Sequence, residues 1–106
     1  MGNPWSGEVT ISLNGECHRA KLTLGALAEL EDSLESGSLL DLVERFEQRR
    51  FSTRDVLALL LVGLRAGGWT GSANDLKAAD FDGGPLYAAR VAAELLARAF
   101  TLPGEP

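Results

Sequence analysis

Residues that carry most catalytic and metal-binding chemistry are scarce in this 106-residue chain, which has one cysteine, one histidine and one tyrosine. Cys17 cannot form a disulfide within the chain, and together with His18 it falls short of the four protein ligands of a structural zinc site. Residues 1–8 lack the basic and apolar segments of a signal peptide. The longest apolar run is far shorter than the about 20 residues that span a bilayer. We therefore expect a cytoplasmic protein with no metal and no other cofactor.

Positive charge is also in the minority. Ten lysines and arginines against fifteen acidic residues give a formal net charge of −5. Duplex nucleic acid and anionic membranes repel such a chain unless its basic side chains are segregated. Only Arg49, Arg50 and Arg54 come close together, and acidic residues flank them. We expect neither nucleic acid nor a membrane as partner, and the length predicts a single domain over residues 1–106.

Alternating apolar and polar residues flank Asn14-Gly15, the dipeptide that favours a two-residue hairpin turn. A two-residue loop sets Ile11 opposite His18 and keeps the apolar residues on one face, whereas a three-residue loop would set Ile11 against Arg19 and mix the faces. The sequence therefore predicts a hairpin over about residues 8–24, with its tip projecting past the core into water. The apolar face in this register holds Val9, Ile11, Leu13, Ala20, Leu22 and Leu24.

Apolar residues recur at helical spacing through the rest of the chain, between serine or threonine caps and glycine stops. The helices are expected at about 25–35, 39–49, 53–66, 73–79 and 85–99. The predicted fold class is α+β, mostly α: an N-terminal two-stranded antiparallel β-hairpin followed by four to five helices packed around a central apolar helix.

The helix at 53–66 is expected to be that centre, because its run VLALLLVGL is apolar in almost every direction and must be covered on several sides. Ser52 with Asp55 indicates a capping box at its start. Gly67 and Gly68 accept the left-handed conformation that commonly ends a helix. Its bounds are therefore the most sharply defined in the chain.

The sequence contains no constellation that positions a nucleophile, a base or a metal, so we do not expect an enzyme. The glycine-rich stretch AGGWTGSAND lacks both common phosphate-binding patterns. One small core does not need all of the aromatic residues that lie near the loops. Aromatic residues at a surface are favoured anchors in protein interfaces. These candidates for partner binding, which can equally be the edge of the core, are Trp5, Trp69, Phe81 and Tyr87.

The segments GEVTISLNG, LTLGALAELEDSL, SLLDLVERF and FSTRDVLALLLVGLRAGG resemble small proteins of the gene transfer agent and phage tail assembly chaperone family, found in alphaproteobacterial tail gene clusters. The resemblance covers about residues 7–100, and its most specific part is Leu24–Glu31. It implies a protein without catalytic residues that engages the tape-measure protein before the tail tube polymerises. Some members of this group are described as tail tube or minor tail components, so a self-assembling structural subunit is the alternative.

The physical character of the chain agrees with the first of these roles. A tape-measure protein is long, helical and largely apolar, and an acidic helical module can cover such a surface and keep it soluble. A structural subunit would instead form homo-oligomeric rings or tubes, for example by strand addition at the hairpin edge. A DNA-binding regulator ranks third, because a helix-turn-helix after Ser38 would place Glu44, Glu47 and Asp55 near phosphates. We expect the protein to be cytoplasmic or incorporated in a phage-like particle.

Overall fold

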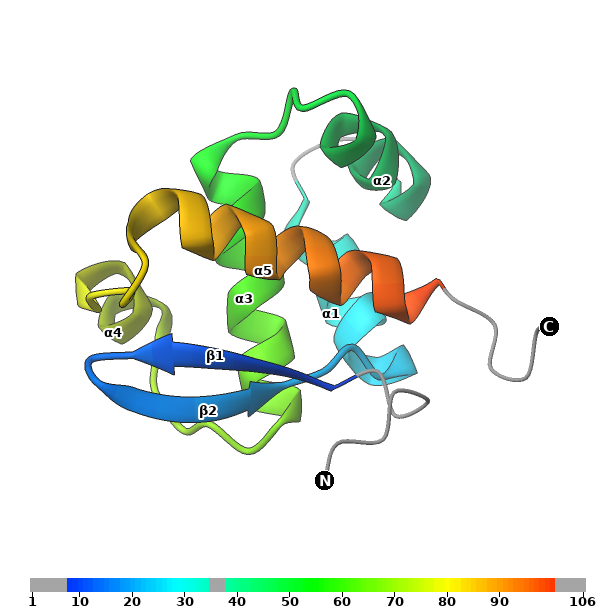
Figure 1. Cartoon of the computed structure of the whole chain (residues 1–106). Helices are drawn as coiled ribbons and strands as arrows, with labels where there is room; N and C mark the ends of the chain where they lie inside the picture. The colour runs from blue at the N-terminus through cyan, green and yellow to red at the C-terminus, as the bar shows by residue number, and fades with distance from the viewer. Residues whose placement is uncertain (1–7, 35–37, 101–106) are drawn as a thin grey trace, which may run out of the picture.

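The computed structural model describes residues 8–34 and 38–100. A two-stranded antiparallel hairpin precedes five helices, which confirms the expected fold class (Figure 1). In chain order the elements are β1 (Val9–Leu13), β2 (Glu16–Ala20), α1 (Leu24–Ser33), α2 (Leu39–Glu47), α3 (Thr53–Ala66), α4 (Ala73–Ala78) and α5 (Gly84–Ala99).

The hairpin has the register that the alternating sequence predicts. Ile11 lies opposite His18 in the β1–β2 ladder. Asn14 and Gly15 have φ angles of 51° and 81°, as a two-residue type I′ turn requires. Ile11 is fully buried, whereas Thr10 is exposed. The two-residue turn is therefore confirmed.

The hairpin is shorter than the expected range of 8–24, and this changes the position of Leu24. Strand β2 ends at Ala20, and the hydroxyl of Thr23 accepts a hydrogen bond from the Ala26 N–H at 3.0 Å, which caps α1. Leu24 is thus the first residue of a helix, where strand parity no longer sets its direction. It is 86% exposed, so its assignment to the apolar face was wrong, and Leu22 is only half-buried.

The hairpin tip is exposed from Asn14 to Cys17, as expected, but it is also hydrogen-bonded to the segment that follows α4. The N–H of Asn14 donates to the carbonyl of Asp80 at 2.8 Å, and the N–H of Asp80 donates to the side-chain oxygen of Asn14 at 2.9 Å. Leu13 forms an isolated antiparallel bridge with Phe81. The segment between α4 and α5 therefore covers part of the outer edge of β1, which would otherwise present unpaired backbone groups.

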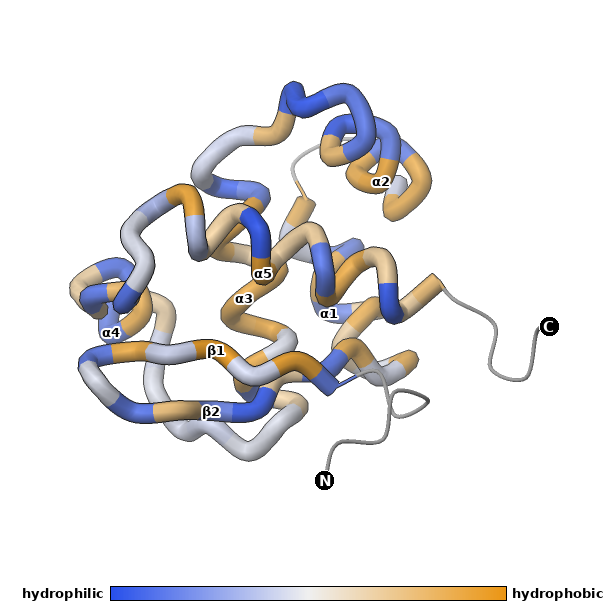
Figure 2. The backbone as a smooth tube through the Cα atoms, viewed as in Figure 1, coloured by the Kyte–Doolittle hydropathy of each residue, from blue (hydrophilic) through white to orange (hydrophobic). Residues whose placement is uncertain are grey.

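Helix α3 lies at the centre, behind α5 and in contact with α1, α4 and β2 (Figure 1). Hydrophobic residues occupy most of this helix, as the orange colour of α3 in Figure 2 shows. Leu59, Leu60 and Leu64 are fully buried. The capping box is confirmed, since Ser52 Oγ accepts from the Asp55 N–H at 3.1 Å and Asp55 Oδ2 accepts from the Ser52 N–H at 2.9 Å.

Two glycines let α3 pack directly against neighbouring backbone and side chains. A Cβ atom on Gly67 would lie 2.1 Å from the carbonyl oxygen of Arg19 in β2. A Cβ atom on Gly63 would lie 3.0 Å from Leu95 Cδ1 in α5. Of the two glycines that follow α3, Gly68 is left-handed with φ 108°, whereas Gly67 has φ −85°. Gly67 is therefore required for close approach, and the expectation that it adopts the left-handed conformation was wrong.

We expect Gly67→Ala to destabilise the domain by about 2 to 3 kcal/mol, because the new methyl group overlaps the Arg19 backbone. Helix propensity by itself would favour alanine by about 1 kcal/mol. The variant is therefore less stable only because the steric overlap outweighs this gain. The measurement is the free energy of unfolding in urea. Gly25→Ala is the control, because its Cβ would meet Thr23 Oγ1 at an ordinary 3.8 Å, and it should be neutral or slightly stabilising. Equal stability of both variants would contradict this account.

Helix α2 ends two residues before the expected range of 39–49. Arg49 has φ 58°. Its backbone N–H donates to the carbonyl of Phe46 at 3.2 Å, and the backbone N–H of Arg50 donates to the carbonyl of Arg45 at 2.7 Å. These two bonds form a Schellman motif, which usually has glycine at the left-handed position. No glycine marks this end in the sequence, which is why the expected range was too long.

Replacing Arg49 with glycine should stabilise the domain by about 1 kcal/mol, because glycine adopts the left-handed conformation without steric cost. Arg49→Ala should change stability by less than about 0.5 kcal/mol, because alanine bears nearly the same cost as arginine. Thermal and urea unfolding of the two variants measure the difference. A glycine variant less stable than the alanine variant would argue against a left-handed Arg49.

Candidate functional site

The structure shows separate surroundings for the aromatic residues singled out in the sequence, and Trp5 lies outside the described residues. Trp69 is half-buried beyond the C-terminal end of α3, where its backbone N–H donates to the carbonyl of Leu64 at 2.9 Å. Its side chain packs against the hydrophobic core. These contacts give Trp69 a structural role within the domain.

Phe81 and Tyr87 both lie beside β1 and are half-buried against the core. The hydroxyl of Tyr87 accepts a hydrogen bond from the Ser12 N–H at 3.1 Å. Asp82 adds a further contact, because its side chain accepts from the Ser12 hydroxyl and its N–H donates to the Ser12 carbonyl at 3.4 Å. The structure therefore brings Phe81 and Tyr87 to one strand and leaves Trp69 at the far end of α3.

A groove of about 720 Å³, here called the α4/α5 groove, lies between the N-terminal half of α3, α4 and the start of α5. Leu86, on its rim, is 81% exposed. Phe81 is the one aromatic candidate among its lining residues. Its apolar lining includes Phe51, Val56, Leu57, Leu76, Phe81 and Leu86.

A second groove of about 510 Å³, here called the α1/α4 groove, lies on the other side of Leu57 and Leu76, which line both hollows. Its floor is a face of α3 that contains Leu57, Ala58 and Leu61, all of them half-buried. The described residues thus cover the central helix on several sides, as expected, but leave the face with Leu57 and Leu61 partly open. The sequence run VLALLLVGL could not reveal the open face, because it is apolar in every direction.

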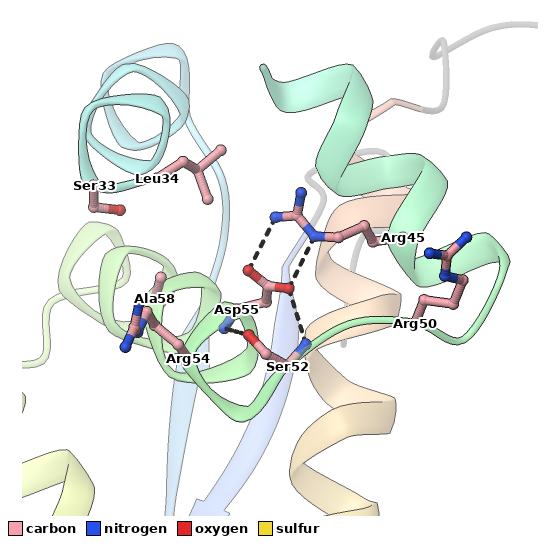
Figure 3. Close-up of a pocket in the computed structure, with 8 residues that line it drawn as sticks. All are labelled: Ser33, Leu34, Arg45, Arg50, Ser52, Arg54, Asp55 and Ala58. Carbon is pink, nitrogen blue, oxygen red and sulfur yellow. Dashed lines mark hydrogen bonds and ion pairs between the residues drawn. The ribbon is translucent and has the colours of Figure 1, made fainter. Parts of the chain in front are cut away.

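A charged pair joins α2 to the start of α3 in a small pocket (Figure 3). Arg45 Nε donates to Asp55 Oδ2 at 3.1 Å, and Arg45 Nη2 donates to Asp55 Oδ1 at 3.0 Å. Asp55 is 8% exposed and also accepts from the Ser52 N–H. One carboxylate therefore both caps α3 and binds α2.

The surroundings of Asp55 determine its protonation. Burial disfavours its charged form, but the hydrogen bonds from Arg45 and Ser52 outweigh this and hold the pKa of Asp55 below its ordinary value. The same hydrogen bond to Asp55 raises the pKa of Arg45. The pair is thus ionised at neutral pH. The sequence indicated only the capping role, because nothing in it shows that Arg45, ten residues earlier, faces the same carboxylate.

The other titratable residues considered in the sequence do not form a common site among the described residues. His18 Nε2 lies 3.8 Å from Glu16 Oε1, with side-chain exposures of 24% and 79%, and Cys17 is exposed. Within residues 8–34 and 38–100, no three or more His, Cys, Asp and Glu side chains group as metal ligands would. None of the helices formed by the described residues has the length and apolar character needed to cross a lipid bilayer.

In the part of the chain that the structure describes, two adjoining apolar grooves thus flank the central helix of this small, mostly helical domain. Over residues 6–101 the chain matches the family described as "Phage tail tube protein, GTA-gp10", and it belongs to that family. It is therefore a protein related to the tails of phages and gene transfer agents. Comparison with curated proteins gives no match, and neither does comparison with solved structures.

Asp55→Asn should lower the free energy of unfolding by about 1 to 2 kcal/mol at pH 7, because it removes the charge from a bidentate hydrogen-bonded pair. Since the folded-state pKa of Asp55 is lowered, its contribution is complete above the unfolded-state pKa of about 3.9 and is lost as pH falls through the folded value. Urea unfolding of both proteins between pH 7 and pH 2 should therefore show the difference shrinking with acid.

Glu94→Gln is the control for this effect. Glu94 accepts from Arg98 Nη2 at 3.0 Å in a more exposed pair on one face of α5. Its loss should cost only about 0.3 to 0.5 kcal/mol at pH 7. If Asp55→Asn cost no more than this control, the pair would not hold α2 in place.

Proposed function

We propose that this protein is a tail assembly chaperone that binds the tape-measure protein of a phage-like particle during tail assembly. Membership of the phage tail family supports a role among tail proteins. The proposed role requires binding and release and no catalytic step. The protein would act in the cytoplasm before the tube closes around its client.

The α4/α5 groove is the observation that carries this proposal. Its lining is mainly apolar, and it lies on a domain whose net charge of −5 keeps a complex soluble. An amphipathic helix binds such a groove through apolar side chains spaced three and four residues apart. An unassembled tape-measure protein exposes helices of this kind, which would aggregate if they were left uncovered.

Among the aromatic candidates, the proposal assigns Phe81 to the binding surface, together with Leu86 on the groove rim. Both are in position to contact a bound helix, and an aromatic anchor in a pocket commonly dominates binding energy. Trp69 and Tyr87 pack within the domain and would support this surface indirectly. No structural role is assigned to Trp5.

A structural tail tube subunit is the second candidate, because the family is described as one of tail tube proteins. Such a subunit must associate with copies of itself. Strand addition at β1 is restricted by the bonds that Asp82 and Tyr87 make to Ser12. Thr10, earlier in β1, is exposed. Self-assembly would therefore depend on other surfaces more than on the C-terminal half of this strand.

The decisive test is a titration of the purified protein with apolar helical segments of the cognate tape-measure protein. We expect binding in the micromolar range, and Leu86→Glu should weaken it by about tenfold or more by placing a charge on the groove rim. Leu24→Glu is the matched control, because Leu24 is equally exposed at 86% but lies outside the groove. Calorimetry measures both affinities, and unfolding curves confirm that both variants fold.

Two results would replace the chaperone with the structural subunit. The first is no binding of any tape-measure segment at hundreds of micromolar. The second is assembly of the protein alone into rings or tubes, seen by electron microscopy. Equal loss of binding in Leu86→Glu and Leu24→Glu would keep a chaperone but move its binding surface away from the α4/α5 groove.

A further inference from the structure

The α1/α4 groove has an apolar floor of helical length. Leu57, Ala58 and Leu61 follow one another along one face of α3 and are half-buried. Arg54 and Arg65 lie at the two ends of the same face, eleven residues apart. That separation corresponds to about 16 Å along the helix axis, or three turns. The floor therefore matches the apolar stripe of a second helix lying along α3.

The two walls of this groove carry opposite charge. On the α1 wall, Glu29 and Asp32 are exposed and line the groove. On the α4 wall, the exposed charged residue among the lining residues is Lys77. Charges that flank an apolar helical seam select the partner and its orientation, as the flanking positions do in coiled coils. The arginines at the ends lie on the midline of the floor and do not distinguish the walls.

We propose that the α1/α4 groove binds an amphipathic helix of the tape-measure protein in one fixed direction, with a basic flank against α1 and an acidic flank against Lys77. This inference rests on the proposed function, because it takes its client from there. A helix that lies apolar face down exchanges its two flanks when its direction is reversed. The charge difference between the walls therefore determines which end of the client helix points toward which end of α3.

Two designed peptides with the same composition test this directly. Each has about four helical turns and one apolar stripe, with lysine on one flank and glutamate on the other, and the second peptide has the flanks exchanged. Each carries a nitroxide spin label at its N-terminus. We expect both to shift the methyl resonances of Ala58 and Leu61, which line this groove and not the α4/α5 groove, with similar affinity. The label should broaden signals near Gly25 with one peptide and signals near Ser33 with the other, because these residues mark opposite ends of α1.

The matched protein variant exchanges the charges of the walls. In Glu29→Lys/Asp32→Lys/Lys77→Glu all three side chains are exposed, so the fold should be retained. For each peptide, the end of α1 whose signals the spin label broadens should change from one to the other in this variant. Glu44→Lys is the control, because it changes the net charge by the same +2 at an exposed position of α2 outside the groove, and it should leave the pattern unchanged.

The inference is overturned if the pattern of broadening is the same with both peptides, or if the exchanged walls leave it unreversed. It is also overturned if Ala58 and Leu61 shift only on raising the protein concentration, since the occupant would then be a second copy of this chain. Its failure is separable from that of the proposed function. Binding of a natural tape-measure segment without shifts at Ala58 and Leu61 refutes only this inference. Directional peptide binding without tape-measure binding refutes the chaperone and the choice of client, and leaves the directionality of the groove standing.

Discussion

The close approach of α3 to the hairpin and to α5 is the constraint on which the rest of the structure depends. Gly67 lets the end of α3 lie against the Arg19 carbonyl, and Gly63 leaves room for Leu95. The carbonyl of Gly63 also accepts a hydrogen bond from the Lys21 N–H at 3.0 Å. Backbone and side chains from β2, from the residue Lys21 just after it and from α5 thus meet on one side of a single helix. On the opposite side, no described residue approaches α3 as closely, and the α1/α4 groove lies there.

This asymmetry explains how so short a chain combines a closed core with an open surface. The glycine side of α3 packs against β2 and α5, and its leucines at positions 59, 60 and 64 are fully buried. Leu57 and Leu61, on the groove side, remain half-buried. The stability of the domain and the binding that we propose for the grooves therefore depend on different faces of the same helix. A change in the grooves can alter partner contacts while leaving most of the core intact.

Local sequence signals predicted the local structure well. The Asn14-Gly15 turn determined the register, and Ser52 with Asp55 marked the start of α3, because each of these depends on residues close together in the chain. Contacts between distant residues were missed: the pair of Arg45 with Asp55, and the docking of the hairpin tip on Asp80. Leu24 was misplaced because alternation was extended past the end of its strand. The grooves were missed because they depend on which helices cover α3, and that information is not in the periodicity of any one segment.

The docking of the hairpin on the segment from Asp80 to Tyr87 also bears on the order in which the chain is made. The hairpin is synthesised before the helices, yet the groups that bond to the outer edge of Ser12 and Asn14 follow 66 to 75 residues later. Until then the apolar face and the outer edge of the hairpin lack their native cover. Completion of the hairpin therefore awaits synthesis of the chain as far as Tyr87 in α5, so this N-terminal element reaches its native surroundings late.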